Sequence, residues 1–299
     1  PHLAFRQSRS GRADFTFDLA QAQDTVGVDV LDASGTPIRT FKLRARAGLN
    51  RVPWDLRYDA APQVVLRTVA PDNPHIFADP RFSGRSTRPV LHWGIEAPVR
   101  TGPIASPGKY SVRLTVAGKS WTEPFEVIRD PAMPSSTADL LASTQTQVRI
   151  RNDMTDAVNM INHIESMRKT IADERSANAD KADVVAALDR LNNQMLGVEL
   201  QLLTRSDMES DDKYYVEQFK VYMNLVWLSG EVGSGAGDVA GGADYRPTAA
   251  SLEVLSGIEQ ALAAARTSYA SLIRTEIPAF NAAMRGRVPE IVPPPVANR

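Results

Sequence analysis

The stretch Val26-Gly-Val-Asp-Val-Leu31, followed by Asp32-Ala-Ser-Gly35, decides how the first part of the chain folds. Its first six residues alternate apolar and polar side chains with the period of a half-buried β-strand. The next four are a tight-turn signal, because glycine tolerates a positive φ and aspartate bonds to its own backbone. Ile38–Leu43 resumes the alternation. Together these residues predict an antiparallel hairpin.

Further strands and turns surround this hairpin. Phe15–Leu19 alternates in the same way, and Tyr110–Val116, the turn at 117–119 and Trp121–Ile128 predict a second hairpin. Pro124 indicates an edge strand, because proline has no N–H to give to a neighbour. Short strands without intervening helical periodicity predict an immunoglobulin-like antiparallel β-sandwich over residues 1–130.

Residues 62–107 interrupt the predicted sandwich with a segment rich in proline and arginine. Its prolines predict a long loop or insertion with little regular structure. Long ordered loops are uncommon unless they bind or pack against something, so this segment is the first candidate contact surface. With the proline-rich C-terminal tail, it supplies the candidate partner-binding residues, which are Arg81, Arg85, Arg88, His92, Trp93, Pro293, Pro294 and Pro295.

Residues 131–299 change to helical periodicity after a linker, Asp130–Pro134. Hydroxyl side chains and an early acid near Ser135 indicate a helix start. We expect an up-down four-helix bundle, followed by an extended tail from Val288. The four predicted helices run from Ser135 to about Asp173, from Val184 to Leu202, from Tyr214 to Leu228 and from Pro247 to Ile273.

Composition excludes several classes of protein. The formal net charge of −1 argues against nucleic-acid binding, which needs a basic surplus. The 299 residues include no cysteine, which excludes disulfides, thiolate catalysis and cysteine-ligated metals. No run reaches the roughly 18 apolar residues that a membrane span requires. Because the chain begins at Pro1, we expect that a leader or a longer precursor has been removed.

Histidine and glycine patterns give no support to metal or phosphate chemistry. His2, His75, His92 and His163 include no pair at the i, i+4 spacing of helical metal ligands. His75 with Asp79 and His92 with Glu96 have that spacing only within the proline-broken loop. His163 is predicted to lie at a helix surface or boundary. Gly230–Gly237 lacks the strand and the Lys-Ser/Thr end of a phosphate loop, which indicates a flexible connector.

Two further patterns have structural interpretations that are favoured over chemical ones. The acids of Ser206–Asp212 lack the glycine and terminal glutamate of a calcium loop, so we predict a solvated loop with helix-capping acids. Asp55 and Asp59 flank Trp54 and Tyr58, but the alternation around Trp54 is more typical of a strand that buries one face. The sequence therefore predicts no catalytic residue, no cofactor, no metal site and no enzymatic activity.

Two segments near the N-terminus resemble a known module. Val28–Phe41 and Ala47–Arg57 resemble the immunoglobulin-type module, of the flagellar hook-cap class, that follows sortilin-like β-propellers in bacterial exported proteins. Gly102–Leu114 with Val127–Pro131 is similar to the next strands of that module. Pro247-Thr248 and Ile277–Asn281 resemble the terminal helical region. The resemblance implies an exported, non-catalytic C-terminal portion without its propeller, and no Ser-x-Asp-x-Gly-x-x-Trp box is present to transfer a catalytic residue.

These observations favour a non-catalytic, extracytoplasmic interaction or scaffold protein. We expect an accessory subunit that stabilises a larger membrane-associated complex, such as a respiratory or photosynthetic one, on its periplasmic face. One alternative is the C-terminal portion of a sortilin-like propeller glycosidase. The other is a carbohydrate-binding module that uses Trp54, Tyr58 or Trp93.

Overall fold

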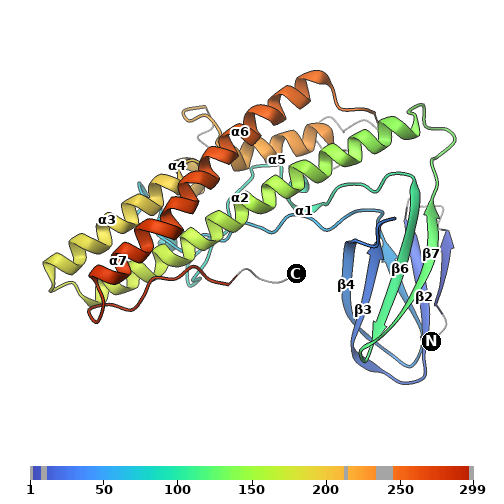
Figure 1. The fold of residues 1–299 in the computed structure, drawn as a ribbon, viewed down its shortest axis with the longest axis horizontal. Coiled ribbons are helices and arrows are strands. Elements are labelled where there is room, and N and C mark those ends of the chain that lie inside the picture. The colour runs from blue at the N-terminus through green and yellow to red at the C-terminus, as the bar shows by residue number, and fades with distance from the viewer. Residues whose placement is uncertain (1–2, 8–11, 212–214, 234–244, 296–299) are drawn as a thin grey trace. The chain divides into compact units, whose positions relative to one another are not determined.

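The computed structural model describes residues 3–7, 12–211, 215–233 and 245–295. Within them the fold is mixed: antiparallel sheets come first and a helical region follows (Figure 1). The strands are β1 (Leu3–Gln7), β2 (Ala13–Leu19), β3 (Gln23–Leu31), β4 (Pro37–Ala45), β5 (Gly48–Trp54), β6 (Gly108–Val116) and β7 (Lys119–Val127). The α-helices are α1 (Ala97–Arg100), α2 (Thr137–Ala177), α3 (Ala182–Glu199), α4 (Arg205–Glu209), α5 (Val221–Val232), α6 (Ala249–Ser271) and α7 (Ile277–Ala283).

Residue contacts divide the chain into two compact units, and each is discontinuous in sequence. Unit 1 comprises Pro1–Ala60, Ala97–Arg151 and Gly230–Thr248. Unit 2 comprises Ala61–Glu96, Asn152–Ser229 and Ala249–Arg299. The sequence predicts a linear boundary at residue 130 instead. The difference arises because most of the 62–107 segment packs with helices rather than with strands.

Unit 1 contains two antiparallel sheets, with strand orders β1-β2-β5 and β4-β3-β6-β7. Both predicted hairpins are confirmed: β3 pairs with β4 and β6 with β7. Gly35 has a φ of 85°, as the first turn requires. Ala117 and Gly118 have φ values of 47° and 78°, the left-handed pair of a two-residue hairpin turn. Pro124 lies on β7, which ends the order of its sheet, so the predicted edge position is also confirmed.

Side chains from both sheets of unit 1 share one apolar core. Phe15 stacks on Trp54 with ring centroids 6.1 Å apart, and Phe125 meets both rings edge-on. Trp54 is fully buried, and its indole N–H donates to the carbonyl of Arg57 at 2.8 Å. The prediction that this strand buries one face is therefore confirmed.

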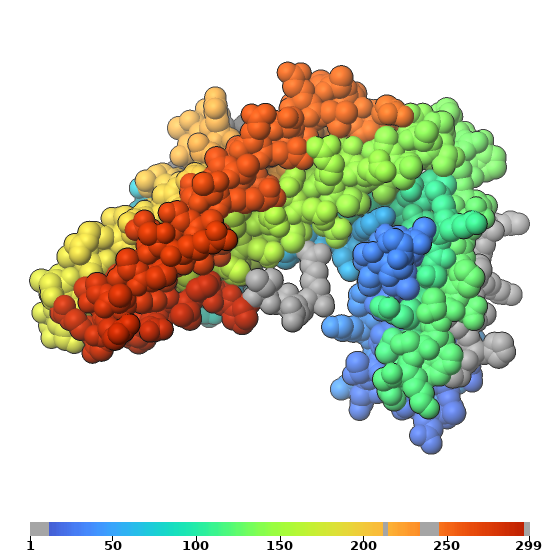
Figure 2. All heavy atoms as spheres, in the orientation of Figure 1, coloured from blue at the N-terminus to red at the C-terminus, as the bar shows by residue number. Residues whose placement is uncertain are grey.

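Unit 2 is built around helices and the irregular segment 61–96. The C-terminal half of α2, together with α3 and α7, contributes to one core that includes Ile164, Leu188 and Ile277. α6 and α7 form a continuous ridge on the viewed face of this unit (Figure 2). The segment 61–96 contains one short 3-10 turn, Ile76–Ala78, but it buries Leu66, Phe82 and Val90. The predicted lack of regular structure is confirmed, and the segment is packed rather than solvated.

The helix predictions differ in outcome. The first two are confirmed as α2 and α3. The third prediction is wrong in its start: residues 215–220 are not helical, and α5 begins at Val221, while Tyr214 lies outside the described residues. Glu217 instead accepts hydrogen bonds from the backbone N–H and hydroxyl of Ser206, which holds this segment in a loop. The predicted connector is described only as far as residue 233.

The fourth predicted helix does not end at Ile273. It continues through a π-helical turn, Leu272–Glu276, into α7. The N–H of Ile277 donates to the carbonyl of Leu272, five residues back. Pro278 explains the change, because its ring clashes with a regular helical turn and it has no N–H to donate. The wider turn accommodates the proline and lets the helix continue.

The C-terminal tail is extended, as predicted, over its described part. Residues 289–295 contain no helix or strand. The tail is anchored at Ile291, which is buried and which exchanges two 2.9 Å backbone hydrogen bonds with the side chain of Asn281. Among the described helices, none combines the length and the apolar character needed to span a membrane.

Candidate binding site

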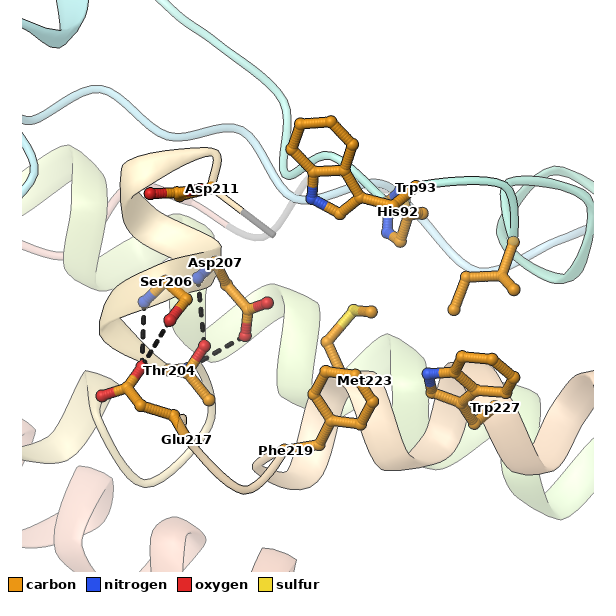
Figure 3. A pocket seen from close by; sticks show the side chains of 11 residues that line it. His92, Trp93, Thr204, Ser206, Asp207, Asp211, Glu217, Phe219, Met223 and Trp227 are labelled. Carbon is orange, nitrogen blue, oxygen red and sulfur yellow. Dashed lines mark hydrogen bonds between the residues drawn. The ribbon is translucent and has the colours of Figure 1, made fainter. Parts of the chain in front are cut away.

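A pocket of about 270 Å³ lies within unit 2 (Figure 3). Residues of the 61–96 segment line one wall, and residues of the α4 region and of α5 line the others. The lining residues are His92, Trp93, Ile95, Thr204, Ser206, Asp207, Asp211, Glu217, Phe219, Met223 and Trp227.

Trp93 forms the upper wall of the pocket and is held there by an unusual backbone. Its φ is 50°, and that of Gly94 is 101°. A bulky residue in the left-handed region is strained, so the surrounding structure must hold it in place. His92 supplies one anchor, since its Nε2 lies 2.8 Å from the hydroxyl of Tyr222 on α5. The Trp93 side chain remains 49% exposed.

The opposite wall comes from α5 and from the residues just before it. The rings of Phe219 and Trp227 stack with centroids 6.3 Å apart, and Met223 lies between them in sequence. Met223 is buried, whereas Trp227 is 38% exposed. Figure 3 shows these side chains facing the space below Trp93. The pocket is therefore a slot with aromatic walls.

One end of the slot is polar and is built by α4. Thr204 caps this short helix: its hydroxyl accepts from the N–H of Asp207 at 3.0 Å, and Asp207 Oδ2 accepts from the N–H of Thr204 at 2.9 Å. This reciprocal capping box fixes the Asp207 side chain at the pocket. Glu217 Oε2 accepts from the N–H and hydroxyl of Ser206 at 3.0 and 2.8 Å. Two carboxylates, Asp207 and Glu217, thus line this end of the pocket.

The pKa values of these two carboxyl groups shift in opposite directions. Burial raises the pKa of Asp207, and the charge of Glu217 raises it further, although the hydrogen bonds with Thr204 oppose the shift. Burial also acts to raise the pKa of Glu217, but the hydrogen bonds from Ser206 outweigh it and lower the value. Glu217 is therefore the more firmly ionised of the pair.

A buried charge network lies close to the α4 region. Arg88 is 2% exposed, and its guanidinium donates to the Ser210 hydroxyl at 3.3 Å and to the Thr68 carbonyl at 3.4 Å. Burial lowers the pKa of Arg88 to about 10, opposed by the charges of Glu165 and Glu199. This network ties the 61–96 segment to the helices and so supports the wall that carries Trp93.

The predicted partner-binding residues have different positions in the structure. His92 and Trp93 line the pocket. The hydrogen bond with Asp79 raises the pKa of Arg81, and the charge of Asp211, another lining residue, adds to the shift. Arg81 is exposed and pairs with Asp79, and Arg85 is exposed without lining the pocket. Arg88 is buried, which corrects the expectation that it offers a surface for a partner. Pro293 and Pro294 are half-buried, Pro295 is exposed, and none of the three lines the pocket.

The other candidate patterns are also located. The acidic segment 206–212 is predicted to be a solvated loop with helix-capping acids. Asp207 does cap a helix. The prediction that the segment is solvated is wrong over the described residues, because Asp207 and Glu209 are buried. His163 is half-buried, with its Nδ1 2.8 Å from the Tyr269 hydroxyl. Trp54 is fully buried and presents no face to a sugar. In the described parts of the chain, no three or more His, Asp or Glu side chains are arranged so that they could hold a metal ion.

Sequence reasoning missed the α5 wall and the capped α4 end of the pocket. A signal was present for the wall, because Phe219, Met223 and Trp227 recur every fourth residue, the spacing of one helix face. No pattern pairs this face with Trp93, which lies more than 120 residues earlier in the chain. Comparisons of the chain with protein-family models, with curated proteins and with solved structures give no match.

Proposed function

We propose that this protein is a non-catalytic docking module that holds a partner protein by accepting one of its side chains between Trp93 and Trp227. One observation carries the proposal: two partly exposed tryptophans face one slot, and one of them is held there in a strained conformation. Tryptophan is among the residues that contribute most to protein–protein binding. Residues held in such a strained conformation cluster at binding and catalytic sites.

The pocket's size also supports docking of a side chain. Its volume of about 270 Å³ lies just below the range of roughly 300–1,000 Å³ that is typical of sites for small molecules and cofactors. A pocket of this size suits one or two side chains. Its polar groups are engaged in a helix cap and in a loop contact, rather than in a pairing of nucleophile and base.

We propose in addition that unit 1 is an immunoglobulin-like β-sandwich and that the long helices belong to an up-down four-helix bundle. The core shared by both sheets supports the first proposal, and the core shared by α2, α3 and α7 supports the second. The extracytoplasmic location, the membrane-associated partner complex and the resemblance to sortilin-like proteins remain predictions. So do the two alternatives, a portion of a propeller glycosidase and a carbohydrate-binding module.

The docking function is tested by purifying the tagged full chain from its native cells in four versions. These are the wild type, Trp93→Ala, Trp227→Ala and the control Tyr245→Ala, which removes an exposed aromatic ring outside the pocket. Quantitative mass spectrometry measures proteins that co-purify in fixed ratio. We expect both pocket variants to lose such a partner at least tenfold and the control to retain it. A partner retained equally by all four versions, or no partner in fixed ratio, would overturn the proposal.

A further inference from the structure

The chemistry of the pocket narrows the kind of side chain that it accepts, and this inference rests on the docking function proposed above. Asp207 is 8% exposed, so its carboxylate is largely removed from water. Its Oδ2 is bonded to the N–H of Thr204, but no hydrogen bond to Oδ1 is present among the described residues. In Figure 3 this second oxygen points away from Thr204 and toward the space beside Met223. Because Asp207 lines the pocket, this oxygen can accept hydrogen bonds from a ligand there.

Glu217 adds to this preference. It accepts from Ser206 through one oxygen, Oε2, and its charge acts on Asp207 across the polar end of the pocket. Two carboxylates in a partly dry site repel each other, and a cation bound at this end of the pocket would relieve that repulsion. Asp211 lines the same end of the pocket.

Among the described residues, two arginines near the pocket are paired with other carboxylates. Arg81 makes a bidentate pair with Asp79, at 3.0 and 2.8 Å. Arg205 pairs with Asp72 at 3.1 Å. Burial acts to raise the pKa of Glu217, whereas the hydrogen bonds from Ser206 and the charges of Arg205 and Lys220 lower it. Lys220 is exposed, and no hydrogen bond joins it to Glu217 in the described structure. Neither Asp207 nor Glu217 forms an ion pair within the described residues, so both carboxylates are available to a cationic ligand.

The walls favour a flat cation. Trp93 lies above the slot, and the stacked pair Phe219 and Trp227 lies below it. Aromatic faces attract cations, and a guanidinium is planar, is weakly hydrated and stacks on such faces. It also forms paired hydrogen bonds with carboxylates, which a compact ammonium does not.

We propose that the pocket accepts an arginine side chain of the partner protein, with the guanidinium at Asp207 and Glu217 and the aliphatic stem between the tryptophans. The occupant is thus a protein that presents an exposed arginine. A partner that presents a lysine or an uncharged side chain there is excluded by the same chemistry.

The test uses the purified full chain and three short capped peptides, Gly-Arg-Gly, Gly-Lys-Gly and Gly-citrulline-Gly. Citrulline keeps the shape of arginine but lacks its charge. Tryptophan fluorescence and calorimetry measure the affinities. We expect a millimolar Kd for the arginine peptide, as suits a single side chain, and at least tenfold weaker binding of the other two. Equal binding of arginine and citrulline, equal or tighter binding of lysine, or no binding of arginine would overturn the inference.

Variants locate the binding. Asp207→Asn and Glu217→Gln keep the size of each side chain. Each is expected to weaken the binding of the arginine peptide at least tenfold. Asp24→Asn is the matched control, because Asp24 is an exposed carboxylate of unit 1 and lies outside the pocket. Thermal unfolding checks that each variant is folded. If Asp207→Asn does not fold, the result for Glu217→Gln decides the test. Unchanged binding in both folded variants would contradict the inference.

The two proposals fail in different ways. If the partner is lost from Trp93→Ala but the arginine and citrulline peptides bind alike, the docking function stands and the arginine inference falls. If the arginine peptide binds as expected but the partner is retained by both tryptophan variants, the docking function falls.

Discussion

At the scale of single residues, Trp93 combines strain with exposure. A non-glycine residue in the left-handed region costs about 1 kcal/mol or more, and Trp93 is followed by a glycine that also has a positive φ. The exposed half of its ring gains little from burial in return. The conformation is therefore a cost to the free protein that binding would offset.

Two substitutions at Trp93 separate this strain from the contact. Trp93→Ala removes the ring but keeps a Cβ at a φ of 50°, whereas Trp93→Gly removes both. We expect the glycine variant to be more stable than the alanine variant by about 1 kcal/mol in urea unfolding, with both losing the partner. An alanine variant as stable as the glycine variant would show that position 93 carries no backbone strain.

Glu199 is a second residue whose environment has a measurable consequence. It is fully buried, and its Oε2 accepts from Arg168 at 2.5 Å while its Oε1 has no partner. Glu165 shares the same arginine and also accepts from the N–H and hydroxyl of Thr68. Of the two carboxyl groups, Glu165 has the donors that stabilise a negative charge, so Glu199 holds the proton more readily.

This arrangement predicts a pH dependence of stability. Burial raises the pKa of Glu199 from 4.5 to about 8, with the charge of Glu165 adding to the shift and Arg168 opposing it. Between these two pKa values the folded state therefore binds a proton that the unfolded state releases. The contribution of Glu199 to the free energy of unfolding is complete below pH 4.5 and is lost as pH rises through 8. Glu199→Gln should make the free energy of unfolding fall less steeply with pH. It should also stabilise the protein at pH 8 by an amount on the order of 1 kcal/mol.

The measurement is the free energy of unfolding in urea at several pH values between 4.5 and 8. Glu253→Gln serves as the control. Glu253 is exposed on α6, and its substitution removes the same charge as Glu199→Gln does. A decline with pH that is as steep in Glu199→Gln as in Glu253→Gln would contradict the assignment of the buried proton to Glu199.

At the scale of elements, α4 has five residues and depends on its cap. A helix of this length has little intrinsic stability, so the Thr204 capping box accounts for much of its order. Thr204→Ala should cost about 1 kcal/mol and weaken binding at the pocket, because Asp207 loses its anchor. Thr267→Ala on α6 is the control, since the Thr267 hydroxyl bonds only within its own helix. Equal effects of the two substitutions in urea unfolding would rule out a special role for the cap.

The turn between β6 and β7 offers a stabilising change. Ala117 has a φ of 47°, an unfavourable conformation for alanine, and Gly118 follows it with a φ of 78°. Asparagine tolerates this region, and Asn-Gly is the preferred pair for such a turn. We expect Ala117→Asn to raise the free energy of unfolding of unit 1 by about 0.5–1 kcal/mol. Amide exchange of β6 and β7 measures it, and faster exchange in the variant would contradict it.

At the scale of the whole molecule, segment 61–96 is required by the helices that follow it much later in the chain. Its backbone N–H groups at Arg67 and Thr68 donate to the buried Glu165 of α2. Replacing residues 62–90 of the full chain by a Gly-Ser linker should remove the donors at Arg67 and Thr68 and leave Arg168 as the remaining donor to this carboxylate, at a cost of several kcal/mol. We expect hydrogen exchange to increase strongly in α3 and in the second half of α2, while β3 and β6 keep their protection. Protection of α3 equal to that of the wild type would contradict this dependence.

Much of the fold could be predicted from local patterns. Alternation and turn residues locate the hairpins, and helical periodicity locates α2 and α3, because these elements are specified by contacts near in sequence. The extent of unit 2 could not be predicted, since hydrogen bonds such as that from Val65 to Asn162 join residues almost 100 positions apart. The candidate site follows the same rule. His92 and Trp93 were recognisable in their loop, but their pairing with Asp207 and Trp227 depends on long-range packing.

The π-helical turn between α6 and α7 has a consequence for how this chain can change in evolution. Buried residues of the helix recur at steps of three or four, as at Leu255, Ile258 and Leu262, but the step from Leu272 to Ile277 is five. A step of five is what remains when one residue is inserted into a regular helix. Deleting one residue from 272–276 would shorten the step from Leu272 to Ile277 to four, the spacing of a regular helix, so the turn would become α-helical and Ile277 would still face the core. The π-helical turn thus accommodates one extra residue, and the buried faces of α6 and α7 stay aligned on the same side of the helix.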